Sequence, residues 1–373
     1  MSLRVLVHVQ HLLGTGHVRR AAAVATALAA RGHAVVLASG GPGVPDLALG
    51  DVRLVQLPPA RAADASFRVL VHPDGRPVDD SWRAARTALL RELLDRVAPD
   101  VVVTELFPFG RRLLEFELLP LLERARARRP RPLIVSSIRD VLAHKGDPAK
   151  LARMVARATA LYDRVLVHGD PALIPLEESF PPAAEIAALT AYTGYVRTPA
   201  GPSPPPGEGE GEIVVSAGGS FVGRRLLEAA LAARPMSAHR NRRWRVLAAD
   251  TGVALRREEG LVVERNRPDF TGLCERAYVS VSQAGYNTAV DLLAARTRAV
   301  LVPFADANET EQTLRADAFA ARGLAVVLAE HALTPASLAA AIDRAAALPP
   351  PAHSVNLDGA GTSASLIEAW VGA

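Results

Sequence analysis

Short β-branched segments alternate with longer Ala/Leu/Arg-rich segments along nearly the whole of this 373-residue chain, in two successive series. The alternation is typical of parallel βαβ units, in which each helix carries the chain back to the starting edge of the sheet. Each series is long enough to form its own core, so the sequence predicts an α/β protein with two Rossmann-like, doubly wound domains. Ligands of such sheets bind at the carboxyl ends of the strands, and we expect the two domains to face each other across a cleft.

The first series predicts strands at Arg4–Val9, His33–Ala38, Val52–Leu57, Asp100–Glu105, Leu133–Ser137 and Arg164–His168. Its predicted helices are Val18–Arg31, Asp80–Val97, Arg111–Arg129 and Pro148–Tyr162. The second series predicts strands at Glu212–Ser216, Trp244–Ala249, Leu261–Glu264, Ala277–Ser282, Ala299–Pro303 and Ala325–Leu328. Its predicted helices are Val222–Ala233, Thr288–Ala295, Glu311–Ala321, Pro335–Ala346 and, at the end, Gly361–Val371.

A Pro-, Gly- and Glu-rich stretch of low complexity separates the two series. It has few side chains to bury, so we expect an extended, solvated linker and place the domain boundary there. The predicted organisation is an N-terminal domain at residues 1–198, a linker at 199–211, a C-terminal domain at 212–350 and a tail helix within 351–373.

Composition and charge narrow the classes of function. The 43 basic and 39 acidic residues give a net charge of +4, too small an excess to indicate nucleic-acid binding. The single cysteine, Cys274, excludes an intrachain disulfide and suits a reducing compartment. The first apolar run is too short for a secretory signal, and no segment has the length of a membrane span. We therefore expect a cytoplasmic protein.

The first candidate motif is Leu13–Arg20, Leu-Gly-Thr-Gly-His-Val-Arg-Arg, which lies directly between a predicted strand and a predicted helix. Glycine allows a tight turn there, and the helix amino terminus offers unpaired N–H groups to an anion. His17 is placed to meet that anion or to transfer a proton. The glycine spacing differs from the dinucleotide fingerprint, so the motif does not indicate NAD.

Three further motifs lie in the second half. Val215–Gly223 repeats the strand, glycine turn and helix of the first motif. Val281–Leu292 places Gly285 at a strand–helix junction, with Asn287 and Thr288 as expected helix caps and an amino terminus suited to a diphosphate. Asp291, one turn later, can accept hydrogen bonds from ribose hydroxyls or can simply complement the helix dipole.

The last motif, Val302–Ala316, is a polar loop that begins a helix. Its Glu311 and Gln312 suit sugar hydroxyls, although the motif alone fits a solvated, capped helix equally well. In the first half, Glu105, Asp140 and His168 follow or end predicted strands. Each could be a loop ion pair, but as a set they supply candidates for a general base and for acceptor contacts.

Together and in this order, the motifs resemble the GT-B glycosyltransferases, in particular the group that includes the peptidoglycan UDP-N-acetylglucosamine transferase. The resemblance covers nearly the whole chain and is strongest in Ser282–Leu292 and Pro303–Ala316. It implies a metal-independent, inverting transfer of a hexosyl unit from a nucleoside-diphosphate sugar, with UDP as the expected nucleotide. The acceptor it implies is an unknown small molecule or lipid.

By this resemblance, His17 matches the family's glycine-loop histidine, Asp291 its ribose-binding Glu and Glu311–Gln312 its sugar-reading pair. The expected catalytic residues are His17, Glu105 and Asp140. The residues expected to bind the nucleotide sugar are Gly14, Gly16, Gly218, Gly219, Ser220, Gln283, Gly285, Asn287, Thr288, Asp291, Glu311 and Gln312.

Several alternatives remain open at this stage. The form of the first motif is also similar to that of a related nucleotide-sugar hydrolase, in which water is the acceptor, and a non-catalytic nucleotide-binding protein is a third possibility. We expect no cofactor and no metal site, because the sequence shows neither an Asp-x-Asp motif nor a His/Cys cluster with ligand spacing. Leu113–Leu122, followed by the basic Arg124–Arg129, could contact a membrane, but a core-packed helix with a solvated basic end is favoured.

Overall fold

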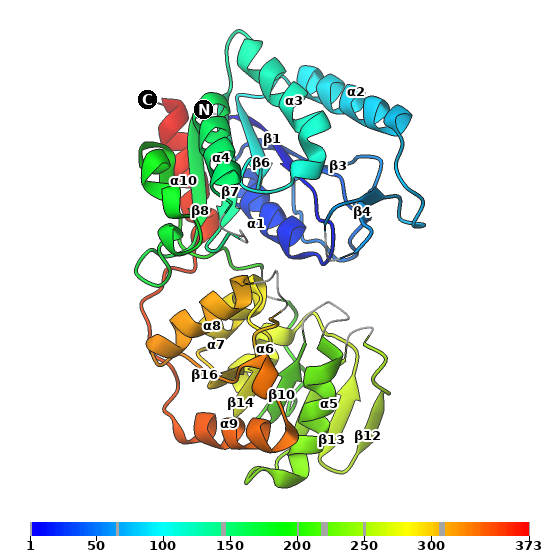
Figure 1. Cartoon of the computed structure of the whole chain (residues 1–373), viewed down its shortest axis with the longest axis vertical. Coiled ribbons are helices and arrows are strands. Elements are labelled where there is room, and N and C mark those ends of the chain that lie inside the picture. The colour runs from blue at the N-terminus through cyan, green and yellow to red at the C-terminus, as the bar shows by residue number, and fades with distance from the viewer. Residues whose placement is uncertain are drawn as a thin grey trace. The chain divides into compact units, whose positions relative to one another are not determined.

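The computed structural model describes residues 2–64, 67–142, 147–199, 201–217, 223–248, 251–305 and 310–372. They form two compact units, each drawn in Figure 1. The N-terminal unit is Met1–Thr198 together with Asp358–Ala373, and the C-terminal unit is Pro199–Leu357. Each unit has its own seven-stranded, mainly parallel sheet, which confirms the predicted α/β class with two parallel-sheet domains.

The sheet of the N-terminal unit has the order β3-β2-β1-β6-β7-β8-β9, and all neighbouring strands are parallel. Its strands are β1 (Arg4–Val9), β2 (Ala34–Ser39), β3 (Arg53–Gln56), β6 (Val101–Glu105), β7 (Leu133–Arg139), β8 (Arg164–His168) and β9 (Thr190–Tyr192). The separate antiparallel pair β4 (Arg61–Ala62) and β5 (Leu70–Val71) and the short edge strand β9 were not predicted, because two or three residues carry no readable alternation.

Helices cover both faces of this sheet (Figure 1). Val5, Val7 and Val9 of β1 pack in one core with α1 (Gly16–Ala30) and α10 (Gly359–Gly372). The alternate residue Leu6 packs in a second core with the helices of the opposite face. Those helices are α2 (Asp80–Val97) and α3 (Glu115–Ala127), preceded by the 3-10 turn η1 (Arg112–Leu114). A neighbouring core holds α4 (Pro148–Leu161) together with the 3-10 segments η2 (Leu176–Glu178) and η3 (Pro181–Leu189).

Local sequence signals set the ends of several of these helices. Asp79 caps α2 by accepting a hydrogen bond from the Trp82 N–H, and Ala98 ends the helix in a left-handed conformation. Asp147 caps α4 in the same way, with Pro148 at the first helical position, where a missing N–H costs nothing. These signals explain why the predicted bounds of α2 and α4 lie within one residue of the observed ones.

The strand order reverses direction between β1 and β6, which are neighbours in the sheet but far apart in sequence. The chain leaves β1 toward α1 on one face and leaves β6 toward η1 and α3 on the other. The two loops therefore diverge and leave room for polar groups at the carboxyl ends of these strands. His17, at the start of α1, and Glu105, the last residue of β6, meet at this point.

The C-terminal unit repeats this plan with the order β12-β13-β11-β10-β14-β15-β16, in which only the edge pair β12–β13 is antiparallel among the described strands. Its strands are β10 (Ile213–Ser216), β11 (Trp244–Leu247), β12 (Arg256–Glu258), β13 (Leu261–Glu264), β14 (Val279–Ser282), β15 (Ala299–Leu301) and β16 (Val326–Val327). The reversal falls between β10 and β14, so the loops that follow these two strands also diverge.

The helices of this unit are α5 (Arg224–Ala233), α6 (Phe270–Arg276), α7 (Tyr286–Ala295), α8 (Glu311–Ala321) and α9 (Pro335–Ala347), with the 3-10 turns η5 (Arg234–Met236) and η6 (Glu330–Ala332). Ile213 and Val215 of β10 pack with α5 and α9 in one core, whereas Val214 packs with α6 on the opposite face. Helix α6 was not predicted, because seven residues are too few to show a helical period. The edge strand β12 was missed as well, since its three residues are all exposed.

The low-complexity stretch behaves differently from the solvated linker that we expected, because it packs on the C-terminal unit. The Arg276 guanidinium donates hydrogen bonds to the carbonyls of Pro204 and Pro205, at 3.1 and 3.0 Å. Glu208 forms an ion pair with Arg267 and lies 3.6 Å from the buried Arg245. The stretch is thus held to the unit by proline carbonyls and one carboxylate, because its glycines and prolines have no polar side chains that could make such contacts.

The tail segment was predicted as a helix of its own, and its helix α10 belongs to the core of the N-terminal unit. Ala364 and Ile367 of this helix are fully buried in that core. The Glu368 carboxylate pairs with Arg31 at 2.6 Å and with the His33 ring at 2.9 Å, both at the end of α1 or just beyond it. The chain therefore passes between the units twice, near residue 198 and near residue 358.

The leucines of the segment considered for membrane contact are core residues. Leu118, Leu121 and Leu122 of α3 are fully buried in the core that also holds Leu6. Arg124 and Arg128 at the basic end pair with Asp95 of α2. These contacts support the favoured interpretation of a core-packed helix with a solvated basic end. Within the described ranges, none of the helices is both long and apolar enough to span a bilayer.

Replacing Ile367 by alanine tests whether α10 completes the N-terminal core. We expect Ile367→Ala to lower the free energy of unfolding by about 2–5 kcal/mol, because it leaves a cavity under α1 that a packed core cannot refill. Urea denaturation followed by circular dichroism measures the change. Ser365→Ala, at an exposed position of the same helix, serves as the control and should change stability by less than about 0.5 kcal/mol. Equal effects of the two substitutions would contradict the assignment.

Candidate active site

The β1–α1 loop places a histidine at the start of α1. Gly14 has φ +62°, a left-handed conformation that glycine adopts without strain, and Gly16 is the first residue of the helix. Thr15 is the N-cap, but its side chain makes no capping hydrogen bond, so the first-turn N–H groups keep their capacity to bind a ligand. His17 follows as the second helical residue.

Three side chains form the centre of the site in the N-terminal unit. The Nδ1 atom of His17 lies 2.8 Å from Oε1 of Glu105, at the end of β6. Arg20, one turn further along α1, donates from Nη2 to the same carboxylate oxygen and lies 3.2 Å from His17 Nδ1. Glu105 and Arg20 are almost completely buried, whereas the His17 side chain remains 15% exposed.

This arrangement fixes the tautomer of the neutral imidazole. A carboxylate held by an arginine is ionised and can only accept hydrogen bonds, so the His17 Nδ1 must carry the hydrogen and donate it. Nε2 is then left with a lone pair, and it contacts no hydrogen-bonding group among the described residues. A histidine oriented through Nδ1 by a buried carboxylate, with Nε2 accessible, is equipped to act as a general base.

The electrostatic surroundings support these protonation states. Burial lowers the pKa of His17, and the nearby Arg111 and Arg20 guanidinium groups lower it further, whereas Glu105 acts in the opposite sense. Burial by itself raises the pKa of Glu105, but His17, Arg20 and Arg111 outweigh it, and the net pKa lies well below the usual range. At neutral pH the pair is therefore a neutral imidazole hydrogen-bonded to a carboxylate.

Two further residues beside this pair were not predicted. Arg111 follows β6 in a left-handed conformation with φ +60°, which is uncommon and strained for a residue other than glycine. Burial lowers its pKa to about 10, and its Nε is buried with no hydrogen-bond partner in the described part of the chain. His11, in the loop after β1, is also buried, and burial followed by the charge of Arg111 lowers its pKa. Arg20 could have been found from its spacing, because residues i and i+3 share a helix face.

A buried polar network holds the loop that precedes His17. Arg86 of α2 donates to Glu117 of α3 at 2.6 Å and to the Gln10 side-chain oxygen at 2.6 Å. The Gln10 amide in turn donates to the carbonyls of His11 and Ala60, each at 2.8 Å. This network ties the loop after β1 to two neighbouring helices, so the backbone leading to His17 has a defined path.

Asp140 and His168 lie at neighbouring strand ends but have structural contacts of their own. Asp140 is fully buried and accepts a hydrogen bond from the Val141 N–H at 2.9 Å. His168 bridges Ser137 at 2.7 Å and Thr193 at 2.9 Å, and burial lowers its pKa to about 3. Neither residue has a described hydrogen bond to His17, so the predicted catalytic role of Asp140 remains a prediction, whereas His17 and Glu105 are brought together.

In the C-terminal unit, α7 begins directly after β14 and presents its amino terminus at the carboxyl end of the sheet. Gly285 is the N-cap, and no described atom lies within 4 Å of the position that a Cβ would occupy there, which leaves room for the close approach of a ligand. The prediction that Asn287 and Thr288 cap this helix is wrong. The helix begins one residue after Gly285, so these two side chains lie within its first turn, and Gly285 itself has no side chain with which to cap the helix.

Gln312 connects the two loops that flank this helix. Its side-chain oxygen accepts hydrogen bonds from the Ala284 N–H at 3.0 Å and from the Phe304 N–H at 3.1 Å. The amide nitrogen has no partner among the described residues and can donate to a ligand. Gln283, one residue before Ala284, is buried directly after β14.

Glu311 and Asp291 are each engaged by a neighbouring side chain. The Glu311 carboxylate pairs at 2.8 Å with Arg315, which is fully buried and also donates to the Ala284 carbonyl at 2.8 Å. This ion pair gives Glu311 a structural contact besides its predicted role in reading the sugar. Asp291 Oδ1 accepts a hydrogen bond from the Thr271 hydroxyl of α6 at 2.8 Å, which fixes the carboxylate beside α7.

Gly218, Gly219 and Ser220, predicted to line the donor diphosphate, lie outside the described residues. Within the described ranges, no three His, Cys, Asp or Glu side chains are grouped to hold a metal ion.

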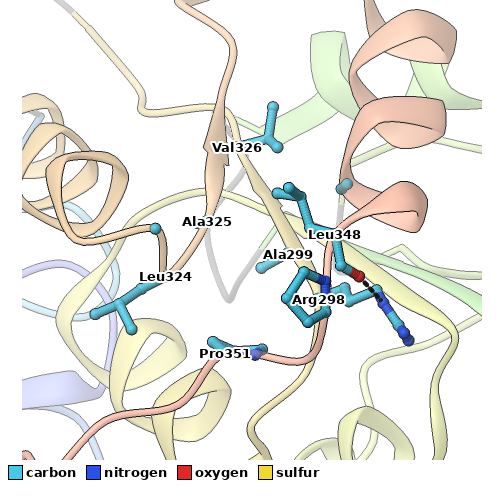
Figure 2. A pocket seen from close by; sticks show the side chains of 10 residues that line it. Arg298, Ala299, Leu324, Ala325, Val326, Leu348 and Pro351 are labelled. Atoms are coloured by element: carbon cyan, nitrogen blue, oxygen red, sulfur yellow. Dashed lines mark hydrogen bonds between the residues drawn. The ribbon is translucent and has the colours of Figure 1, made fainter.

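A shallow pocket in the C-terminal unit lies away from these motifs (Figure 2). It is lined by Ala299 at the start of β15 and by Val326 at the start of β16, so it lies at the amino ends of parallel strands. Arg298 Nε donates to the Leu348 carbonyl at 2.6 Å beside the pocket. The motif residues lie at the opposite, carboxyl ends, and this pocket is therefore not part of the candidate active site.

Comparisons with known proteins agree with the resemblance found in the motifs. Residues 265–354 match the glycosyltransferase family 28 C-terminal domain. A UDP-N-acetylglucosamine–N-acetylmuramyl-(pentapeptide) pyrophosphoryl-undecaprenol N-acetylglucosamine transferase from Syntrophotalea carbinolica is 32% identical over 147 residues. That match spans 37% of this chain and 41% of the relative, so the chain covers less than half of the length of its curated relative.

Solved structures show the fold of the whole chain. The calicheamicin glycosyltransferase CalG4 matches with a TM-score of 0.65 at 19% identity, over 100% of this chain and 99% of that one. The glycosyltransferase VinC, solved in complex with dTDP, matches with a TM-score of 0.62 at 15% identity, over 100% and 96%. The chain therefore has the GT-B fold, with a family 28 C-terminal domain and a distant relationship to the peptidoglycan transferase.

The buried His168 makes the stability of the protein depend on pH. Its folded pKa of about 3 lies below the value near ~6.5 of an unfolded chain. Its neutral form stabilises the fold fully above ~6.5, and this contribution decreases as pH falls toward the folded pKa. When the pH is lowered from 7 to 5, the free energy of unfolding of His168→Gln should therefore fall by about 2 kcal/mol less than that of the wild type. Urea denaturation at both pH values measures the difference. His331→Gln, at an exposed position, is the control, and an unchanged pH dependence in His168→Gln would contradict the result.

Proposed function

We propose that this chain, which has the GT-B fold and a family 28 C-terminal domain, transfers a sugar from a nucleoside-diphosphate sugar to an acceptor hydroxyl. The observation that carries the proposal is the His17–Glu105 pair at the strand-order reversal of the N-terminal sheet. It supplies a base with an accessible lone pair in the half of the molecule that the resemblance assigns to the acceptor. The reaction is an inverting, metal-independent transfer.

The proposed chemistry uses the Nε2 lone pair of His17. As the acceptor oxygen attacks the anomeric carbon, its proton passes to Nε2, a new C–O bond forms and the bond from carbon to the diphosphate oxygen breaks. The nucleoside diphosphate leaves with that electron pair, and attack from the opposite face inverts the anomeric centre. Glu105 stabilises the imidazolium that forms, because its carboxylate already accepts the Nδ1–H.

The C-terminal unit would bind the donor. The amino terminus of α7, with Gly285 as its N-cap, would direct the N–H groups of its first turn at the diphosphate, and their dipoles would stabilise the negative charge of the leaving group. Asp291 would accept hydrogen bonds from the ribose, and the free amide nitrogen of Gln312 would donate to a sugar hydroxyl. UDP is the expected nucleotide, and the dTDP bound by VinC makes thymine the other base to test.

Hydrolysis of a nucleotide sugar is the second candidate, because the same His17 lone pair can take a proton from water. The side chain is only 15% exposed, which suits a small nucleophile as well as a hydroxyl on a larger acceptor. A screen of nucleotide sugars separates the candidates. Release of free sugar at full rate without an added acceptor indicates hydrolysis, and binding without turnover indicates a nucleotide-binding protein.

Replacing His17 tests the proposed base. His17→Gln should lower turnover of the donor by about a hundredfold or more, because general base catalysis is lost, while the Kd for UDP or dTDP changes little. Steady-state kinetics and isothermal titration calorimetry measure the two quantities. His331→Gln, an exposed histidine of the C-terminal unit, is the control. Near-normal turnover of His17→Gln combined with a lower Tm would make His17 a structural residue.

Replacing Asp291 tests the donor site independently of the base. Asp291→Ala should weaken the binding of UDP or dTDP by about 10- to 100-fold, the usual cost of losing hydrogen bonds to a charged group. Thr271→Val is the matched control, since it removes only the 2.8 Å bond between the two helices. Similar affinities for both variants and the wild type, measured by calorimetry, would exclude the ribose-binding role.

A further inference from the structure

The charges around His17 do not balance within the described part of the N-terminal unit. Glu105 brings one negative charge from β6, while Arg20 brings a positive charge from α1 and Arg111 a second one from the loop after β6. Glu105 accepts from Arg20 and His17 through Oε1, and its Oε2 has no hydrogen-bond partner among the residues that the structure describes. Arg139, at the end of β7, adds a third positive charge that acts on Arg111. One carboxylate therefore faces several guanidinium groups.

Arg111 has capacity left for a ligand. Its buried Nε donates to no described residue, whereas the Arg20 guanidinium already donates from Nη2 to Glu105. A buried charged donor without an acceptor costs free energy, and the left-handed backbone of Arg111 adds strain. A fold retains such a residue where a ligand completes its contacts, and the group that completes a guanidinium is an anion.

We propose that Arg111 binds an anionic group of a ligand, a phosphate or a carboxylate, and that this anion sets how strongly His17 takes up a proton. The second half of the inference rests on the proposed role of His17 as the base. Without the anion, the positive charges of Arg111 and Arg20 disfavour the imidazolium. With the anion bound, the charge of Arg111 is compensated and the imidazolium is stabilised.

The consequence is a base that gains strength when its ligand arrives. Without a bound anion, burial and the guanidinium groups of Arg111 and Arg20 hold the pKa of His17 low, so the ring is a weak proton acceptor. An anion next to Arg111 raises that pKa toward the range in which proton transfer at neutral pH is efficient. Unproductive activation of water is thus suppressed until the ligand is present. The anion can belong to the donor diphosphate or to an acidic acceptor, because both offer the same chemistry.

Nuclear magnetic resonance of the full chain with 15N-labelled histidine measures the His17 pKa directly and needs no turnover. The probe is inorganic phosphate, titrated into the wild-type protein. We expect phosphate to raise the His17 pKa by about one pH unit or more, the usual effect of one nearby charge. Arg111→Met should raise it similarly without phosphate and should abolish the response to phosphate, whereas Arg111→Lys should keep the wild-type value. Arg112→Met, which removes an exposed charge one residue away, should have no effect.

A wild-type His17 pKa that phosphate leaves unchanged overturns the proposal, even if the variants fail to fold. An Arg111→Met protein whose His17 titrates as in the wild type overturns it as well. Separate titrations with UDP or dTDP and with glycerol phosphate identify the source of the anionic group. A shift of the His17 pKa that depends on Arg111 supports the proposal for whichever ligand causes it. If His17→Gln keeps full turnover while these shifts occur, the role as base fails and the anion site stands.

Discussion

One carboxylate oxygen organises the N-terminal site. Glu105 Oε1 receives hydrogen bonds from both His17 and Arg20, and this sharing has two effects. Without the arginine, the buried carboxyl group would take up a proton, and Arg20 keeps it ionised. The ionised oxygen in turn fixes which nitrogen of His17 carries hydrogen and which way the ring faces. If the carboxyl group were protonated, it could donate to Nδ1, and the accessible Nε2 would then carry the hydrogen instead of the lone pair.

The same topological feature positions both halves of the candidate chemistry. The strand order reverses between β1 and β6 in one unit and between β10 and β14 in the other, so polar loops diverge at corresponding places. Buried arginines then hold these loops, Arg86 through Gln10 and Arg315 through the Ala284 carbonyl. Both arginines also form buried ion pairs, with Glu117 and Glu311. A buried ion pair adds little net stability but requires a defined geometry. We therefore infer that these two ion pairs orient the loops.

The sequence predicted the architecture well, because strands buried on both faces and amphipathic helices have clear patterns. The predicted bounds of β1, β8 and α2 coincide with those observed. His17 and Glu105 were both predicted, but their contact depends on strand order, which periodicity does not contain. Arg111 was missed, because an arginine in an arginine-rich chain carries no signal until the fold buries it. The cap prediction at Asn287 failed for a local reason, since the helix begins at the glycine junction itself.

The packing of α10 on α1 has a consequence for how the protein is made. The C-terminal unit is one uninterrupted stretch of chain, whereas the N-terminal unit needs residues from both sides of that stretch. A ribosome synthesises Pro199–Leu357 in full before it reaches Ile367. The alanine- and valine-rich surface of α1 that Ile367 covers therefore stays open while the second unit emerges. The part of the protein that is translated first is the last to close its core, and during that interval it presents an apolar face to chaperones.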